Sequence, residues 1–407
     1  MKKRVIVCFI VCIAAVMSVS AQTAESYFTA GLEKAKKGLY QEAIMAFTKA
    51  IELNASYPDA YYHRGVAKSD LGDKTNAIAD YTKAIGLNSQ YVEAYNNRGV
   101  IKLKLGDKEG ALIDLTRAIE LNPQGAELYS NRGAVKDALG HIQAAITDYT
   151  KAIELNPQFA KAYSNRGLVQ SKLGDKIASL SDFTKAIELD PQLAESYYNR
   201  GLVNLKFGDK QDALVDFTKA IELNPQFAEA YSDRGIAKSD LGDKEGAIGD
   251  YNKAIEVNPQ YAGAYNNRGL AKSTLGDKNR AIADYMKAIE LNPQYAEAYN
   301  NRGVAKLSLG DKKNALADYN KAIELNPQYA GAYNNRGIVK ASLDDNYGAI
   351  ADWTKAIEVN PQYAEAYYNR AIMYGQQGKI PLACADLQKA KELGYKDAEE
   401  FIKKACK

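Results

Sequence analysis

Residues 296–329 read AEAYNNRGVAKLSLGDKKNALADYNKAIELNPQY, and close variants of this unit recur along nearly the whole chain. Arg268, Arg302 and Arg336 are each 34 residues apart, and Pro293 and Pro327 keep the same step. A fixed period of this length indicates that one supersecondary unit is repeated, and that neighbouring units share their core. The 407 residues are therefore expected to form an array rather than a set of unrelated domains.

Each unit is predicted to contain two helices joined by a tight turn. The first helix runs from about 296 to 309 and ends at Gly310, because glycine accepts the left-handed conformation that closes a helix. The second helix runs from about 313 to 325 and ends before Pro327, because proline cannot continue the hydrogen-bond ladder. In repeat ten Asp344 replaces the turn glycine, and aspartate tolerates this conformation.

Small residues on one helix face bulky residues on the other. Gly303 has no side chain, so we expect Tyr319 of the second helix to approach the first helix closely at this point. Aromatic, small and proline residues at fixed offsets make up the pattern of this unit: Tyr299, Gly303, Ala315, Tyr319, Ala322 and Pro327.

With these residues the chain resembles tetratricopeptide repeat proteins over 24–397. The resemblance implies an all-α superhelix, a solenoid of eleven helix–turn–helix repeats that begin at 24, 58, 92, 126, 160, 194, 228, 262, 296, 330 and 364. An apolar stripe at helical spacing, which includes Ala398, Phe401 and Ile402, predicts a capping helix over 398–407.

The N-terminus is typical of a secretory signal peptide, residues 1–21. Three basic residues at 2–4 precede an apolar stretch over 5–17, and Val19 and Ala21 are placed for cleavage before Gln22. We therefore expect an exported protein, periplasmic or secreted, with no transmembrane segment after cleavage. The alternative is an uncleaved membrane anchor, for which thirteen apolar residues are short.

The charge balance argues against nucleic acid as a partner. The chain has 53 basic and 50 acidic residues, and three of the basic ones belong to the signal peptide, so the mature chain is near neutral. A nucleic-acid binder usually carries a basic excess that neutralises phosphates.

Cys8 and Cys12 leave with the signal peptide, whereas Cys384 and Cys406 remain near the C-terminus. In an exported chain this pair can form a disulfide that ties the capping helix to the last repeat. The alternative is two unpaired thiols.

Ten repeats carry an arginine just before the position that is usually glycine on the first helix, and an aspartate just before the position that is usually aromatic on the second helix. We predict ion pairs between them, for example Arg98 with Asp114, Arg268 with Asp284, and Arg302 with Asp318. Repeat one has Ala30 and Ala46 at these places, so both partners are missing together. The alternative is that the arginines bind an acidic partner. A lysine that often follows on the first helix is interpreted as solvated or paired.

A short polar residue, mostly asparagine, precedes each of these arginines. In tetratricopeptide repeat proteins the first helices line the concave face, and the row resembles the asparagine ladder of O-linked N-acetylglucosamine transferases, which holds peptide main chains. The candidate peptide-binding residues are Asn97, Asn131, Asn165, Asn199, Asn267, Asn301, Asn335 and Asn369. An amide can donate and accept like a peptide group. The alternative is that each asparagine bonds the neighbouring helix and only orders the stack. The residues beside the row are mostly uncharged, with asparagine and serine next to it and aliphatic residues one turn on, so we predict an uncharged groove.

Nothing in the sequence indicates catalysis. The two histidines have no metal-ligand spacing, no phosphate-binding glycine loop is present, and neither remaining cysteine has a histidine nearby to activate it. We predict a non-enzymatic scaffold that binds a protein or peptide, needs no cofactor or metal and has no small-molecule substrate. The alternative is a structural subunit of a larger cell-envelope assembly.

Overall fold

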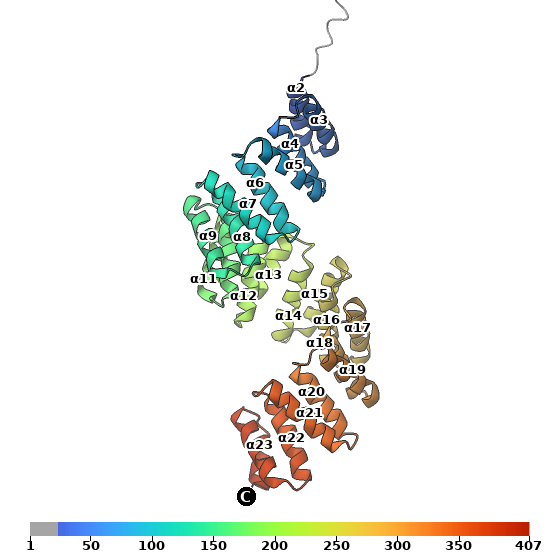
Figure 1. The fold of residues 1–407 in the computed structure, drawn as a ribbon. Helices are drawn as coiled ribbons and strands as arrows, with labels where there is room; N and C mark the ends of the chain where they lie inside the picture. Colours follow the sequence, from blue (N-terminus) through green and yellow to red (C-terminus); the bar gives the residue numbers. More distant parts are fainter. Residues whose placement is uncertain (1–22, 407) are drawn as a thin grey trace, which may run out of the picture. The chain divides into compact units, whose positions relative to one another are not determined.

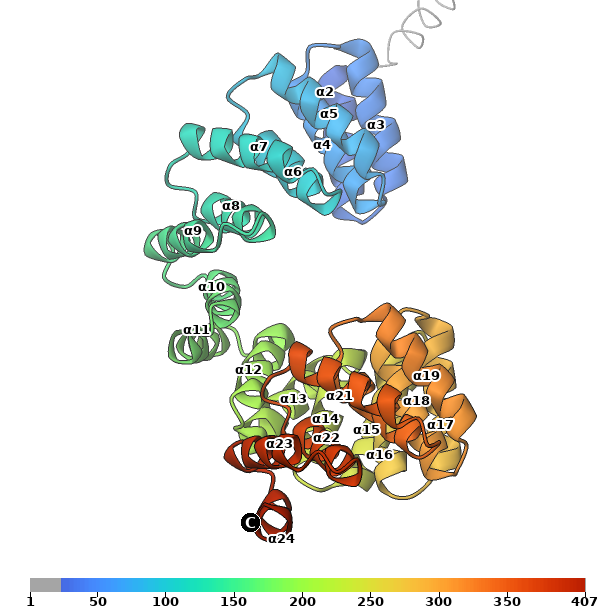
Figure 2. The ribbon, with the colours of Figure 1, turned by 60° about the horizontal axis from the view of Figure 1, so that its bottom comes forward.

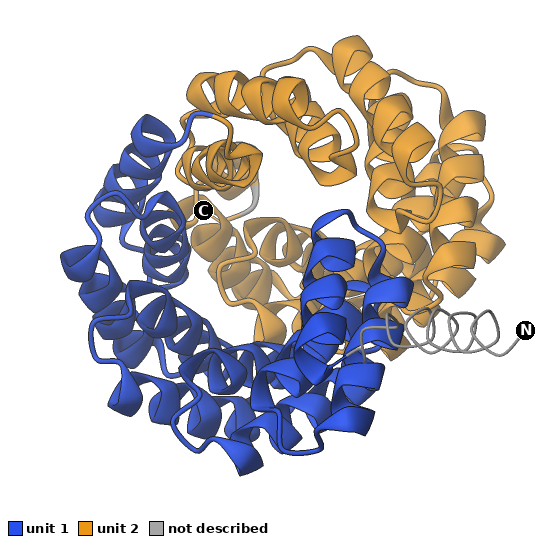
Figure 3. Ribbon diagram, turned by 90° about the horizontal axis from the view of Figure 1, so that it is seen from above, with its two compact units in different colours: residues 1–191 blue, residues 192–407 orange. Residues whose placement is uncertain are grey.

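The computed structural model describes residues 23–406, and the regular structure in this range is helical throughout (Figure 1). The predicted signal peptide lies outside the described residues. The chain divides into two compact units, residues 1–191 and 192–407 (Figure 3). Unit 1 and unit 2 are described separately below.

Unit 1 contains the first five repeats, each a pair of antiparallel helices. Its helices are α2 (Ala24–Lys36), α3 (Tyr40–Leu53), α4 (Pro58–Asp70), α5 (Lys74–Leu87), α6 (Val92–Lys104), α7 (Lys108–Leu121), α8 (Ala126–Ala138), α9 (Ile142–Leu155), α10 (Ala160–Lys172) and α11 (Lys176–Leu189).

Unit 2 contains the other six repeats and one shorter helix. Its helices are α12 (Ala194–Lys206), α13 (Lys210–Leu223), α14 (Ala228–Asp240), α15 (Lys244–Val257), α16 (Ala262–Thr274), α17 (Lys278–Leu291), α18 (Ala296–Ser308), α19 (Lys312–Leu325), α20 (Ala330–Ala341), α21 (Asn346–Val359), α22 (Ala364–Gln376), α23 (Ile380–Glu392) and α24 (Ala398–Ala405). In both units the first helix of each repeat begins where the repeats were expected to begin.

The turn between the two helices of a repeat is set by adjacent glycine and aspartate residues. Gly310 has a φ of 83°, a conformation that ends α18 without strain. The next residue, Asp311, caps α19, because its carboxylate accepts a hydrogen bond of 3.2 Å from the backbone N–H of Asn314. Only residues 309–311 therefore separate α18 from α19.

The close approach expected at Gly303 is present. A Cβ atom built on Gly303 would lie 2.7 Å from the ring of Tyr319, so any side chain there would push α18 and α19 apart. Tyr319 and Ala315 also pack against Val339, which belongs to α20 of the next repeat. The core is therefore shared between repeats, and a single helix pair would leave part of its apolar surface uncovered.

Within each unit the stack bends toward the first helices of the repeats. First helices of successive repeats contact one another, as α6 with α8 and α16 with α18 do, and in residues 23–406 second helices show no comparable contacts. In unit 1, α8 and α10 lie in one row and α9 and α11 in another (Figure 2). The first helices therefore line the concave side within a unit.

The helix α24 covers the last repeat. Ala398 is buried, and Ile402 packs with it against Ala371 and Leu387 of α22 and α23. A disulfide joins Cys384 of α23 to Cys406, with an S–S distance of 2.01 Å. Of the two possibilities for these cysteines, the structure has the bonded one.

We expect removal of the disulfide to lower the local stability of α24. In Cys406→Ser, or after reduction, we expect backbone amides of α24 to exchange with solvent faster, because a bridge across 22 residues contributes about 3 kcal/mol in the chain-entropy account. Native-state hydrogen exchange measures this effect. Amides of α2 and α3 are the internal control and should not change, because a repeat contacts only its neighbours. Unchanged protection of α24 would show that its packing alone holds it.

Candidate functional site

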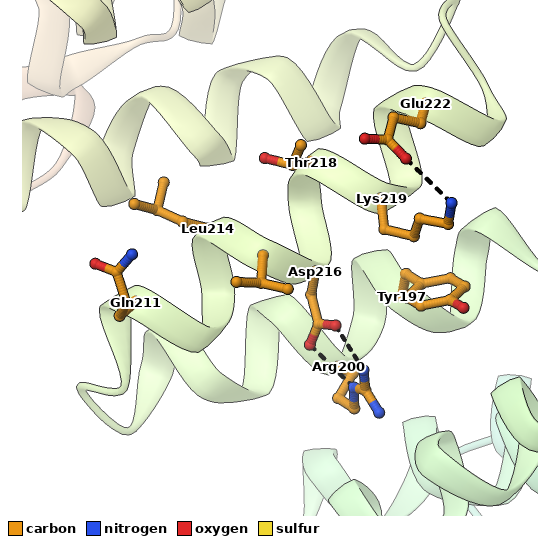
Figure 4. A pocket seen from close by; sticks show the side chains of 9 residues that line it. Tyr197, Arg200, Gln211, Leu214, Asp216, Thr218, Lys219 and Glu222 are labelled. Atoms are coloured by element: carbon orange, nitrogen blue, oxygen red, sulfur yellow. Dashed lines mark hydrogen bonds and ion pairs between the residues drawn. The ribbon is translucent and has the colours of Figure 1, made fainter.

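The ion pairs expected from the sequence are present on the described helices. In each pair the arginine of the first helix donates through Nε and Nη2 to both carboxylate oxygens of the aspartate on the second helix, at 2.6–2.8 Å for the shorter contact. The ten pairs are Arg64–Asp80, Arg98–Asp114, Arg132–Asp148, Arg166–Asp182, Arg200–Asp216, Arg234–Asp250, Arg268–Asp284, Arg302–Asp318, Arg336–Asp352 and Arg370–Asp386. Figure 4 shows the pair of Arg200 and Asp216. We call them the arginine–aspartate pairs.

Each carboxylate is nearly buried, and most of them accept from a second donor. The side chain of Asp318 is 5% exposed, and it binds Lys306 at 2.8 Å as well as Arg302. The lysines interpreted as solvated or paired are thus paired, in seven repeats: Lys68, Lys102, Lys136, Lys238, Lys272, Lys306 and Lys340. In repeat six the amide of Asn204 takes this place, at 3.2 Å from Asp216.

Most of the arginines also donate a hydrogen bond to the preceding repeat. Nη1 of Arg336 donates to Asn320, at 2.9 Å, on the second helix of repeat nine. Nη1 of Arg98 donates in the same way to Thr82, at 3.0 Å. The guanidinium of Arg336 also lies 5.5 Å from the ring centre of Tyr333, a cation–π contact. Hydrogen bonding to Asp352 raises the pKa of Arg336 further, so the cation is permanent. The guanidinium groups of arginines with these contacts already bond groups within the stack. This argues against their use as ligands for an acidic partner.

The asparagine row lies half-buried on the first helices. Its amides donate to the preceding repeat: Asn97 to the hydroxyl of Tyr62 at 3.1 Å, Asn131 to Asn96 at 2.9 Å, Asn301 to Asn266 at 3.1 Å, Asn335 to Asn300 at 3.0 Å and Asn369 to Asn334 at 3.0 Å. For Asn165 and Asn267, the residue at the acceptor position one repeat earlier in the sequence is a serine, Ser130 and Ser232 respectively. Asn199 holds the row position on the first helix of unit 2. The alternative in which the asparagines order the stack is therefore at least partly correct.

In Asn301 these bonds use half of what the amide offers. A side-chain amide has two N–H donors and two oxygen lone pairs. Asn301 uses one N–H toward Asn266 and one lone pair toward Asn300, at 3.4 Å. One donor and one acceptor remain, which is the hydrogen-bonding pattern of a peptide group.

Tyrosines beside the row complete the hydrogen-bonded surface. Burial raises the pKa of Tyr295, Tyr329 and Tyr363 to about 12, so their phenols stay protonated at neutral pH. Amides and phenols thus present neutral polar groups along the first helices.

The face is not uncharged, contrary to the sequence-based expectation. An acidic residue precedes most members of the row by four positions, which is one helical turn, and so shares their face. These acidic residues are Glu93, Glu127, Glu195, Glu229, Glu297 and Glu365. Glu297 lies 3.5 Å from the amide of Asn266, which places its carboxylate at the row. The i, i+4 spacing is readable in the sequence, whereas the expectation of an uncharged groove rested on the nearer neighbours of each asparagine.

Two hollows lie in unit 2. One, of about 510 Å³, is formed by α12 and α13 around Tyr197, Leu214 and the pair of Arg200 and Asp216 (Figure 4). No member of the asparagine row lines it. The other, of about 560 Å³, lies between α20, α21, α22 and α24, and Asn369 of the row lines it.

Two further features bear on the class of protein. The described residues contain no cluster of three or more histidine, cysteine or carboxylate side chains suited to hold a metal ion. Among the same residues, no helix is long and apolar enough to span a bilayer. His63 packs among the rings of Phe28, Phe47 and Tyr62, and burial lowers its pKa.

Comparisons with known proteins give the family and the fold. Two family models described as tetratricopeptide repeat match residues 92–124, 194–227 and 296–329, and residues 160–193. A third, described as TPR repeat, matches 31–72, 69–106, 138–174, 237–276, 274–310 and 341–378. No curated protein matches the sequence.

Among solved structures, the chain is similar to yeast Tom70, with 19% identity, a TM-score of 0.50, and coverage of 94% of this chain and 95% of that one. It is also similar to the APC/C hetero-tetramer Cut9-Hcn1, with 16% identity, a TM-score of 0.51 and coverage of 97% and 98%. A tetratricopeptide repeat protein from Parabacteroides merdae has 22% identity and a TM-score of 0.51, with coverage of 61% and 99%. At these identities the likeness shows the fold.

The arginine–aspartate pairs predict a non-additive effect on stability. We expect Asp318→Ala to destabilise repeat nine by on the order of 3–5 kcal/mol, because Arg302 is left as a buried cation without its partner. The double variant Arg302→Ala, Asp318→Ala reproduces the alanines of repeat one and should lose less. Native-state hydrogen exchange of α18 and α19 measures both. A double variant less stable than Asp318→Ala would contradict this account.

The position of Asp233 leads us to expect a pH-dependent contribution to the stability of the folded chain. It stands in the row position, accepts a hydrogen bond of 2.7 Å from the Tyr198 hydroxyl, and has a pKa that burial raises above 3.8. The folded state therefore disfavours the ionised carboxylate of Asp233. The free energy of unfolding falls as the pH rises from the unfolded-state pKa of this group through its raised pKa in the folded state. We expect Asp233→Asn, which copies the natural Asn97–Tyr62 pair, to gain thermal stability over the wild type progressively as the pH rises from 3.8 to neutrality. A difference between the two unfolding midpoints that does not change with pH would refute this origin.

Proposed function

Because this chain belongs to the tetratricopeptide repeat family, we propose that it is a non-catalytic scaffold that binds an extended polypeptide along the first helices of its repeats. Repeats of this family mediate protein–protein interaction and are generally non-catalytic. We further propose where this polypeptide lies on the first helices and which residues hold it.

The asparagine row carries the proposal. Asn301 has one N–H and one lone pair beyond those used in the stack. Most successive repeats within a unit place an asparagine at this position, at a regular spacing. An extended main chain offers donors and acceptors in the same pattern whatever its sequence. The row therefore favours recognition of the backbone rather than of particular side chains.

The acidic residues add a preference for basic partners. Glu93, Glu127 and Glu297 are exposed and lie one turn before members of the row. Carboxylates in such a line attract lysine and arginine side chains and speed their encounter. We therefore propose that the bound polypeptide carries basic residues.

We also propose that the protein is exported, to the periplasm or the extracellular space. The composition of residues 1–21, which is typical of a signal peptide, supports this. The disulfide between Cys384 and Cys406 is consistent with it, because such bonds persist in oxidising compartments.

Two sets of substitutions separate ligand binding from ordering of the stack. In the first, Asn267, Asn301 and Asn335 are all changed to Ala. In the matched control, their buried neighbours Asn266, Asn300 and Asn334 are changed to Ser, the residue that repeat seven has there. The control breaks the bonds between repeats and keeps the row.

We expect the first set to weaken binding of random-sequence peptides, long enough to cross three repeats, by one to two orders of magnitude. Each lost hydrogen bond to the main chain contributes about 1 kcal/mol. The control should bind nearly as the wild type does. Equal loss in both sets, or no loss in the first, would refute the proposal. Recovery of the native chain only in a stoichiometric complex, without reversible capture, would indicate the structural subunit instead.

A further inference from the structure

The hollow at the C-terminal end of unit 2 is suited to a long side chain. Its volume is about 560 Å³, and Ile338, Tyr368, Ile372 and Phe401 contribute to its walls, with the nearly buried Trp353 behind them. We call it the C-terminal hollow. Aliphatic and aromatic walls of this kind cover the apolar stem of a ligand.

Asp344 is the only charged residue that lines the C-terminal hollow. Its carboxylate has no ion-pair partner in the part of the chain that the structure describes. It is also the one non-glycine residue with a positive φ, 63°, within 23–406. Glycine stands at this position in the ten other repeats, where the conformation carries no steric penalty. An acidic side chain therefore occupies a place where glycine is less strained.

One wall of the hollow is covalently tied to the last repeat. Phe401 belongs to α24, which the disulfide between Cys384 and Cys406 holds against α23. Its ring meets Tyr368 edge-on, with ring centres 5.6 Å apart. The aromatic wall is thus specific to this end of the array.

The C-terminal hollow also adjoins the asparagine row, because Asn369 lines it. A polypeptide held by the row would therefore bring a side chain to the hollow. The delivery of a side chain to the hollow therefore rests on the proposed function.

We propose that the C-terminal hollow receives an arginine side chain of the bound polypeptide. The arginine stem packs on Ile338 and Ile372, and the planar guanidinium stacks on the aromatic wall. The fork of N–H donors matches the carboxylate of Asp344, which a lysine ammonium matches less well. The exposed carboxylates near the row give the approaching cation a favourable field.

The single tryptophan of the chain provides the measurement. Trp353 lines the hollow, so its fluorescence reports occupancy at this place alone. The probes are the capped tripeptide Ala-Arg-Ala and its uncharged analogue Ala-citrulline-Ala, titrated into the full mature chain. The variants are Asp344→Gly, which restores the residue of the other repeats and should fold at least as well, and Asp344→Asn, which removes only the charge.

We expect the arginine peptide to change Trp353 emission in a saturable way, and to bind both variants roughly fivefold more weakly than the wild type. The citrulline peptide should bind all three proteins alike. Added salt should weaken the arginine peptide more on the wild type than on either variant, because only the wild type has the carboxylate of Asp344. Equal affinity of the arginine peptide for wild type and Asp344→Gly, or no emission change in the wild type, would overturn the proposal.

This test is independent of the test of the row. A tripeptide is too short to reach several repeats, so it should bind the variant with Asn267, Asn301 and Asn335 changed to Ala as tightly as the wild type. If long peptides fail to bind while the tripeptide still does, the proposed function fails and the hollow stands. If long peptides bind and the tripeptide does not, the hollow fails and the function stands.

Discussion

The bidentate pairing of arginine with aspartate inside each repeat is the constraint on which the rest of the structure depends. Arg336 holds Asp352 across its own helix pair and reaches Asn320 in the repeat before it. Buried charge is costly unless it is paired and hydrogen-bonded, so each repeat accepts few alternative arrangements of its helices. The same residue fixes the geometry inside a repeat and the contact between repeats, which keeps the array in register.

This arrangement also decides which groups remain for a partner. The arginines, the lysines beside them and the aspartates are used by the stack, so the first helices present amides, phenols and carboxylates instead. Asn301 shows how one side chain can serve both purposes, since its bonds to Asn266 and Asn300 orient the amide and leave one donor and one acceptor unused in the stack. A row oriented in advance loses little conformational entropy on binding.

Much of the fold could be predicted because period, turn and close contact are local. Gly303, Gly310 and Pro327 placed both helices of repeat nine to within a residue or so, and the joint absence of the charged pair in repeat one pointed to the bond between Arg302 and Asp318. The bonds from arginine to the preceding repeat were not predicted, because they depend on the angle between repeats, which the period does not contain. The C-terminal hollow depends likewise on how α24 docks, and the acidic line was visible only once helix faces were compared.

The central claim is that the asparagine row holds a polypeptide main chain while it orders the stack. A crystal structure of the full mature chain with a bound basic peptide tests it most directly. The account predicts peptide N–H and carbonyl groups within hydrogen-bond distance of the row amides, with the amide bonds between repeats, such as Asn335 to Asn300, still present. A peptide seated on the second helices, or row amides that turn away from their neighbours to reach it, would contradict the account.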